Sequence, residues 1–244
     1  MGAKTALLAH ADGDGPALLR QAVGAAPDRE RTGALMDRLY RGWTVEPGGR
    51  SRALFEVVYP APGEAFAGSW PGVDVLCDRR FMLDRPSQLP ADLLATGPGR
   101  RTVLHAMHSV VDWLAFALWE DGRLVRSLSV TPDDGVIEDL GDPLPFELPY
   151  WAGEHPVEPL PEDEGGQLYP LPFHPLSLGE DALHALFGFN AEGHPADVEE
   201  TGMLPYLVGE PGAAPRAAAA ARPHRSQYYL MGPDGRPILI GEPS

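Results

Sequence analysis

The chain has 244 residues, with 19 Lys plus Arg against 35 Asp plus Glu, so its formal net charge is −16. This charge disfavours a surface that follows nucleic-acid phosphates, and the single cysteine, Cys77, excludes an internal disulfide or a multi-cysteine metal site. No apolar run approaches the roughly 20 residues of a membrane span, and the opening residues show no secretory leader pattern. These features predict a cytoplasmic protein with neither a nucleic-acid nor a membrane partner.

The first hundred or so residues read as alternating short elements with clear boundary signals. Pro16 suits the first turn of a helix and Gly24 its exit, while Asp28 suits an N-cap and Pro90 another first turn. We predict, in chain order, a strand over 4–10, helices over 17–24 and 29–40, extended segments over 53–59 and 73–78, and a short helix between 86 and 97.

The segment from Val103 to Leu140 carries the clearest pattern. Asp121-Gly122 is a type I′ turn signal, and a second turn signal lies over 131–135. Three consecutive antiparallel strands are therefore predicted, with residues 104–119 forming the first of them. The predicted architecture is α+β, with a mixed or mainly antiparallel sheet, a central β-meander and helices packed on one face.

The second half of the chain predicts a wrap, a helix and a tail. Residues 141–175 are rich in proline and aromatic side chains, which predicts an ordered wrap over the sheet. Ser177-Leu178-Gly179-Glu180 is a capping-box pattern for a helix that ends at Gly188. We predict a single α+β domain over 1–189, a flexible Pro/Gly/Ala-rich linker over 190–226, and a β-hairpin or tail over 227–244.

Five segments carry a family resemblance: Met1–Leu8, Pro71–Val75, His108–Ala115, Pro149–Pro156 and Tyr169–Leu176. With these segments the chain resembles an uncharacterised family of cytoplasmic proteins from high-GC actinobacteria, over residues 1–189. The resemblance implies a bacterial domain of unknown function, and it transfers no catalytic residue to this chain.

Asp12 and Asp14 form a loop that could bind a metal ion. They lie where a strand passes into a helix, which is where open α/β sheets bind ligands, and their carboxylates could hold Mg²⁺. The same residues also suit a tight turn and a helix cap. A metal-dependent hydrolase or phosphoryl-handling enzyme that adds His10, His108 or His174 is therefore the alternative function; otherwise no cofactor is expected.

His105, His108 and Asp112 are spaced three and four residues apart. On a helix they would share a face, but along one strand the two histidines point apart and His108 lies about 13 Å from Asp112. We therefore expect buried polar groups with separate partners, Arg126 being the candidate for Asp112. A pairing of Cys77 with either histidine stays open as an alternative.

The proline-rich wrap supplies the other candidate site. Rigid aromatic and imidazole groups on such a backbone lose little entropy on binding, although the same rings could simply seal the sheet. The candidate binding residues are Tyr150, Trp151, Glu154, His155, Tyr169, Phe173 and His174. The sequence thus predicts a non-enzymatic interaction module that binds a protein partner through an acidic surface and this wrap.

Overall fold

The structure is a computed structural model, and the part of the chain that it describes falls into two units, Met1–Pro211 and Gly212–Ser244. It describes residues 3–95, 99–157, 170–192 and 201–212, together with the backbone of 228–231 and 237–241. Within these ranges, every helix is too short or too polar to cross a lipid bilayer.

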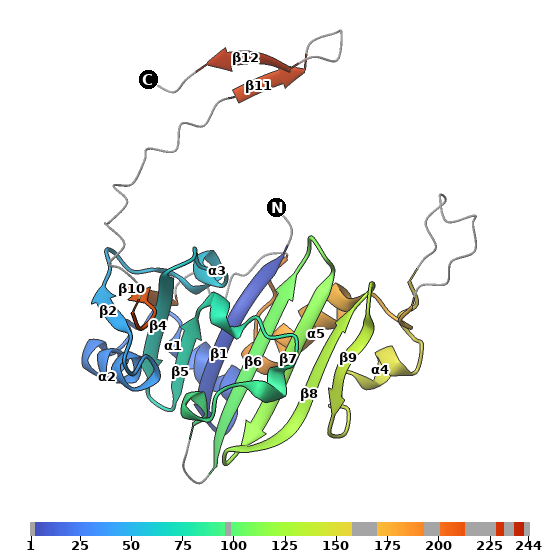
Figure 1. Cartoon of the computed structure of the whole chain (residues 1–244), viewed down its shortest axis with the longest axis horizontal. Helices are drawn as coiled ribbons and strands as arrows, with labels where there is room; N and C mark the ends of the chain where they lie inside the picture. The colour runs from blue at the N-terminus through green and yellow to red at the C-terminus, as the bar shows by residue number, and fades with distance from the viewer. Residues whose placement is uncertain are drawn as a thin grey trace. The chain divides into compact units, whose positions relative to one another are not determined.

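A ten-stranded antiparallel sheet forms the framework of the first unit (Figure 1). Its strands are β1 (Lys4–Asp12), β2 (Thr44–Pro47), β3 (Arg52–Ala53), β4 (Glu64–Trp70), β5 (Val73–Cys77), β6 (Arg100–His108), β7 (Trp113–Glu120), β8 (Arg123–Thr131), β9 (Gly135–Leu140) and β10 (Gly202–Gly209). They lie in the order β2-β10-β4-β5-β1-β6-β7-β8-β9, and β3 also pairs with β10. The sheet is therefore mainly antiparallel, as the sequence predicts.

Strand β1 lies at the centre of the sheet, between β5 and β6. Because successive side chains of a strand point to opposite faces, Leu7 enters the core on one face and Leu8 the core on the other. We call these the first face and the second face. Every residue of 5–11 is buried, which explains why β1 reads as a nearly continuous apolar run instead of an alternating one.

Helices cover both faces of the sheet, so the prediction of helices on one face is wrong. They are α1 (Gly15–Ala22), α2 (Arg29–Leu39), α3 (Leu54–Val57), α4 (Leu148–Trp151), α5 (Pro175–Phe187), and the 3₁₀ turns η1 (Arg79–Phe81), η2 (Pro86–Gln88) and η3 (Ala91–Leu93). Apolar side chains of α1, α3, α4 and α5 enter the first-face core, while those of α2 and the 3₁₀ turns enter the second-face core. In Figure 1, α1 and α5 pass behind the sheet.

Helix α5 begins earlier than its capping-box pattern predicts. His174 is the N-cap, its Nδ1 accepts a hydrogen bond from the Leu176 N–H, and Pro175 occupies the first turn. A Cβ at Gly179 would lie 3.1 Å from the Met107 sulfur, so this glycine allows the helix to approach the sheet closely. At the other end Gly188 adopts the left-handed conformation, as the sequence predicts.

The four strands β6 to β9 follow one another in space as in the chain. Asp121 and Gly122 both have positive φ, as a type I′ turn requires, so the predicted β7–β8 hairpin is confirmed. The single strand predicted over 104–119 is wrong, because the chain turns back between His108 and Trp113 and these two residues face each other across the β6–β7 pair. Asp112 takes a positive φ of 45° in this turn.

Two further local predictions need correction. The segment 53–59 contains the short helix α3 instead of an extended strand, and strand β4 was not predicted. The single helix expected between 86 and 97 is two 3₁₀ turns, η2 and η3, each preceded by a residue with extended backbone or by proline. The predicted helices near 17–24 and 29–40 correspond to α1 and α2, and Asp14 and Asp28 cap them.

Strand β10 lies in the segment for which the sequence predicts a flexible linker. It pairs with β2 on one side and β4 on the other, so the first unit extends to Pro211 and does not end at Phe189. In the second unit, β11 (Tyr228–Met231) and β12 (Pro237–Gly241) pair in antiparallel fashion. Residues 193–200 and 213–226 of the predicted linker lie outside the described residues.

A buried guanidinium ties α4 to the sheet. Arg126 on β8 is fully buried and donates hydrogen bonds to both carboxylate oxygens of Glu147, from Nε to Oε1 and from Nη2 to Oε2, and Glu147 is also fully buried. It also pairs with Asp139 on β9. Burial by itself lowers the pKa of Arg126, but the hydrogen bonds and the charges of these two carboxylates outweigh it and raise that pKa above its ordinary value.

We expect Arg126→Met to lower the free energy of unfolding by about 3–5 kcal/mol, because the Glu147 carboxylate would stay buried without a counter-charge. Replacing Glu147 by leucine as well should restore part of the loss. The matched control is Arg123→Met at an exposed position of the same strand. Urea unfolding measures all three variants, and equal stability of Arg126→Met and Arg123→Met would contradict the role given to this pair.

Candidate functional site

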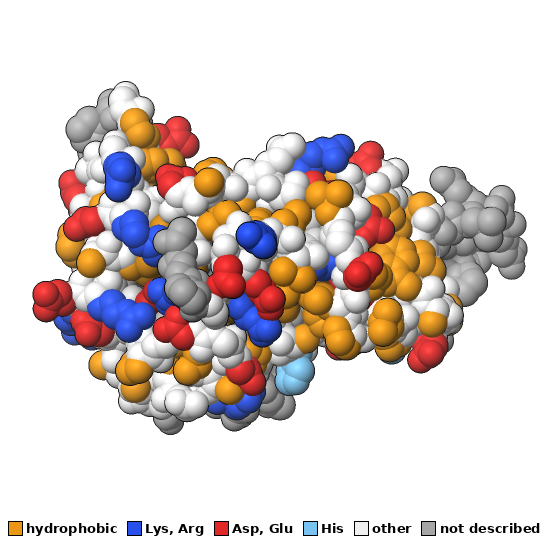
Figure 2. Space-filling view, turned by 90° about the horizontal axis from the view of Figure 1, so that it is seen from below, with side chains coloured by type: hydrophobic (Ala, Val, Ile, Leu, Met, Phe, Trp, Pro, Cys, Tyr) orange, Lys and Arg blue, Asp and Glu red, His pale blue; other side chains and the backbone are white. Residues whose placement is uncertain are grey.

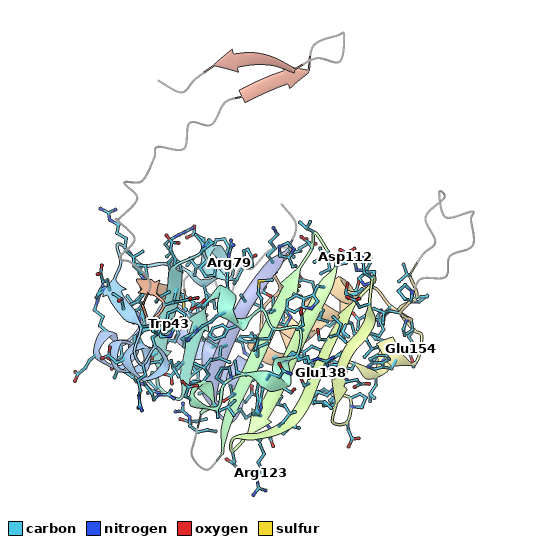
Figure 3. All side chains as sticks on the ribbon, in the orientation of Figure 1. Trp43, Arg79, Asp112, Arg123, Glu138 and Glu154 are labelled. Atoms are coloured by element: carbon cyan, nitrogen blue, oxygen red, sulfur yellow. The ribbon has the colours of Figure 1, made fainter. Side chains whose placement is uncertain are left out.

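A groove of about 700 Å³ opens on the second face, where the β6–β7 and β8–β9 turns meet the segment between η1 and η2. It is lined by Met82, Asp84, Arg85, His108, Val111, Trp113, Thr131, Asp133, Asp134, Val136 and Ile137. In Figure 3 the groove lies at the end of the strands where Asp112 is labelled, and Arg123 is labelled at the opposite end.

The groove has an apolar floor. Trp113, at the start of β7, is 7% exposed, and its indole N–H has no hydrogen-bond acceptor among the described residues. Met82 and Ile137 pack against the same second-face core. The β8–β9 register shifts between Ser129 and Val130, and this bulge allows both Ile137 and its neighbour Glu138 to face η2. The bulge thus places an additional apolar side chain in the groove.

The rim of the groove is acidic. Asp84, Asp133 and Asp134 are exposed, and Arg85 is the one basic residue in the groove lining. Burial, followed by the charges of Lys4 and Arg79, lowers the pKa of His108 and so favours its uncharged form. The groove therefore combines an apolar floor with an excess of negative charge, which suits a ligand that carries both apolar and cationic groups.

At the opposite end of the strands, acidic and basic side chains are interspersed (Figure 2). Arg100 lies 2.7 Å from Asp12, and Arg101 lies 2.7 Å from Glu120. The buried carboxylate of Asp74 also lies between basic groups. The charges at that end compensate one another, so the uncompensated carboxylates of the groove are a local feature and not merely the average composition of the chain.

Asp12 and Asp14 are both engaged in structural contacts. Besides its ion pair with Arg100, Asp12 ends strand β1, and the Asp14 side chain accepts a hydrogen bond from the Ala17 N–H as the N-cap of α1. Within the described ranges, no group of three or more His, Cys, Asp or Glu side chains is placed to hold a metal ion. The turn-and-cap alternative for this loop is the one that these contacts support.

His105 and His10 are buried on opposite faces of the sheet. His105 donates from Nε2 to the Gly179 carbonyl, and its Nδ1 lies 2.8 Å from the Thr5 hydroxyl. His10 donates from Nε2 to the Leu93 carbonyl. Burial lowers the pKa of each imidazole to about 4, so both are uncharged at neutral pH. Of the three residues expected to be buried with separate partners, His105 is buried as expected, whereas His108 and Asp112 are only half-buried and for them the expectation is wrong.

The expected partnership of Arg126 with Asp112 is wrong, because Arg126 faces the carboxylates of Glu147 and Asp139. Asp112 instead lies 3.6 Å from Nε2 of His174. Cys77 is fully buried in the first-face core, and burial raises the pKa of its thiol, which keeps it protonated. A protonated thiol in this position is a packing group and not a nucleophile.

The candidate residues of the wrap form one interlocked aromatic cluster. Phe173 is fully buried, with its ring centroid 5.5 Å from that of Tyr150 and 5.0 Å from that of Trp151. The Tyr150 hydroxyl donates to Asp181 on α5, and the His155 ring stacks on Tyr150. These contacts seal the first-face core against α5.

The remaining wrap candidates are placed differently. Glu154 is exposed next to α4, as Figure 3 shows, and His174 caps α5. Tyr169 lies outside the described residues. The structure therefore brings Tyr150, Trp151, His155 and Phe173 together, but at a place separate from the groove, whose lining contains none of the residues singled out in the wrap.

Sequence reasoning found only His108 among the residues that line the groove. Asp133 and Asp134 were interpreted as turn chemistry, which they also supply, and Met82 and Trp113 are far apart in the chain. The two adjacent carboxylates at 133–134 are a sequence feature that could indicate a site. No sequence pattern near them, however, indicates that residues 82–85 lie against them. The site could be recognised only after the strand order was known.

Comparison with known proteins adds one finding. The model of a family of unknown function (DUF6928) matches residues 5–205. No curated protein and no solved structure matches the chain. The matched span contains every residue that lines the groove.

The two buried histidines predict a pH-dependent stability. Their folded pKa values of about 4 lie below the ordinary value of 6.5, so the unfolded chain binds more protons between these limits. The free energy of unfolding should therefore fall as the pH drops from 6.5 to 4, by up to about 1.4 kcal/mol per pH unit for each histidine.

Urea unfolding at a series of pH values tests this expectation. His105→Gln should reduce the slope of the free energy of unfolding against pH by an amount equivalent to about one bound proton, because it removes one of the two titrating groups. His184→Gln, at an exposed position of α5, is the matched control. If His105→Gln keeps the full slope of the parent protein, the assignment of a neutral buried imidazole is wrong.

Proposed function

The chain belongs to the DUF6928 family of unknown function, and we propose that it is a non-enzymatic interaction module whose groove binds a basic segment of a partner protein. The observation that carries this proposal is the combination of an apolar floor, formed by Trp113, Met82 and Ile137, with three rim carboxylates against one guanidinium. The presence of a single cysteine, which cannot form an internal disulfide, supports a site of action in the reducing cytoplasm.

The charge of the groove argues for a basic partner. The whole chain carries a formal net charge of −16, which attracts a basic surface over a long range and repels acidic ones. At short range, Asp84, Asp133 and Asp134 can pair with lysine or arginine side chains, while the apolar floor accepts their aliphatic stems. Long-range attraction and the local lining therefore favour the same class of ligand.

The surroundings of the groove argue for a polypeptide and against a lone small molecule. Val110, Val111 and Val136 are 72%, 52% and 45% exposed around its mouth. Together they extend the apolar surface beyond the cavity itself, as expected where a partner covers the rim of a pocket. A small cation would leave these side chains in water.

Replacing both Asp133 and Asp134 by asparagine should weaken binding of a basic peptide by about tenfold or more at low salt, because two rim charges are lost. A synthetic peptide in which arginine and valine alternate is a suitable probe, with affinity measured by fluorescence anisotropy. The effect should shrink as salt is added, because exposed charges are screened.

A control of equal charge change is Asp37→Asn with Glu46→Gln, at exposed positions on α2 and β2. This variant should keep nearly the full affinity of the parent protein. If both double variants lose affinity equally, the peptide responds to net charge alone and the groove is not the binding site. If the parent protein does not bind the peptide at all, the proposed function is wrong.

A further inference from the structure

We infer that the partner segment binds as an added β-strand along the free edge of β9, with its basic side chains entering the groove. This inference rests on the proposed function and adds to it the conformation of the partner and the backbone that recognises it. Strand addition is a common mode of peptide recognition, in which main-chain hydrogen bonds supply affinity and side-chain pockets supply specificity.

The edge of β9 is open. This strand ends the sheet order, and in the part of the chain that the structure describes its main-chain groups form backbone hydrogen bonds only with β8. The Leu140 carbonyl accepts from the Arg126 side chain instead. The other end of the sheet is β2, a four-residue strand that contains Pro47, which lacks an N–H and is a poorer template.

The groove lies beside this edge. Val136 and Ile137 at the start of β9 line it, and so do Asp133 and Asp134 in the preceding turn. Every second side chain of an added strand would point to the second face, where the groove opens. A peptide in which basic and apolar residues alternate could therefore place its cationic groups in the groove while its apolar side chains point to the first face.

The charges around the edge select for a basic strand. Asp133, Asp134, Asp139 and Asp142 are exposed in or next to β9, and Arg126, the basic residue nearest to them on β8, is fully buried and paired with carboxylates. A second copy of this acidic edge would be repelled, which protects the protein from pairing with itself. The carboxylates of Asp133, Asp134 and Asp142 attract a strand that carries arginine or lysine, whereas Asp139 is already paired with Arg126.

Two measurements on the full chain test the inference with the alternating arginine–valine peptide. Hydrogen–deuterium exchange should show slower exchange of amides in 135–140 when the peptide is bound, and no change in 44–47 of β2. Two N-methylated peptides of equal charge, each methylated at alternate residues along one edge, should then differ in affinity by at least about tenfold, because only one edge pairs with β9.

The outcomes separate this inference from the proposed function. If the peptide binds, Asp133→Asn with Asp134→Asn weakens it, and yet both N-methylated peptides bind equally with no protection of 135–140, the groove binds a basic segment but strand addition is wrong. If protection appears over 44–47 instead, the partner uses the other edge and the inference is also wrong. Failure of every peptide to bind overturns the proposed function itself.

Discussion

Burial of the central strand on both faces is the constraint from which most of the structure follows. With helices on the first face and 3₁₀ turns with α2 on the second, β1 and β6 have no face left for water. Polar side chains there must be neutral and hydrogen-bonded, as His10, His105 and Thr5 are. On these two strands the charged side chains therefore lie only at the ends, as Lys4, Asp12, Arg100 and Arg101 do.

The two ends serve different purposes because they are covered differently. At the Asp12 end, ion pairs such as Arg100 with Asp12 neutralise the surface. At the other end, the segment between η1 and η2 does not cover the second face completely, and a groove remains there. The bulge in β9 turns Ile137 towards this groove. The groove therefore lies where the layer on the second face stops, and its rim carries three carboxylates against the single guanidinium of Arg85.

Turns and helix caps could be predicted from the sequence, because they depend on a few neighbouring residues. The Asp121-Gly122 turn and the Asp28 cap both occur as predicted. Strand β4 was missed because its Ala, Gly and Ser side chains have little strand preference of their own, and it is held by neighbours on both sides. The groove could not be predicted, because Met82 and Trp113 meet only through the strand order, which the sequence pattern does not specify.

Strand β10 has a consequence for how the protein reaches its folded state. It inserts between β2 and β4, with Leu204 opposite Ala67, although it is the last strand of the first unit to leave the ribosome. Until then a nascent chain that already contains β4 leaves one edge of this strand without its partner. Such late, long-range pairing slows folding, because the long chain segment between β4 and β10 must close before the two strands can pair.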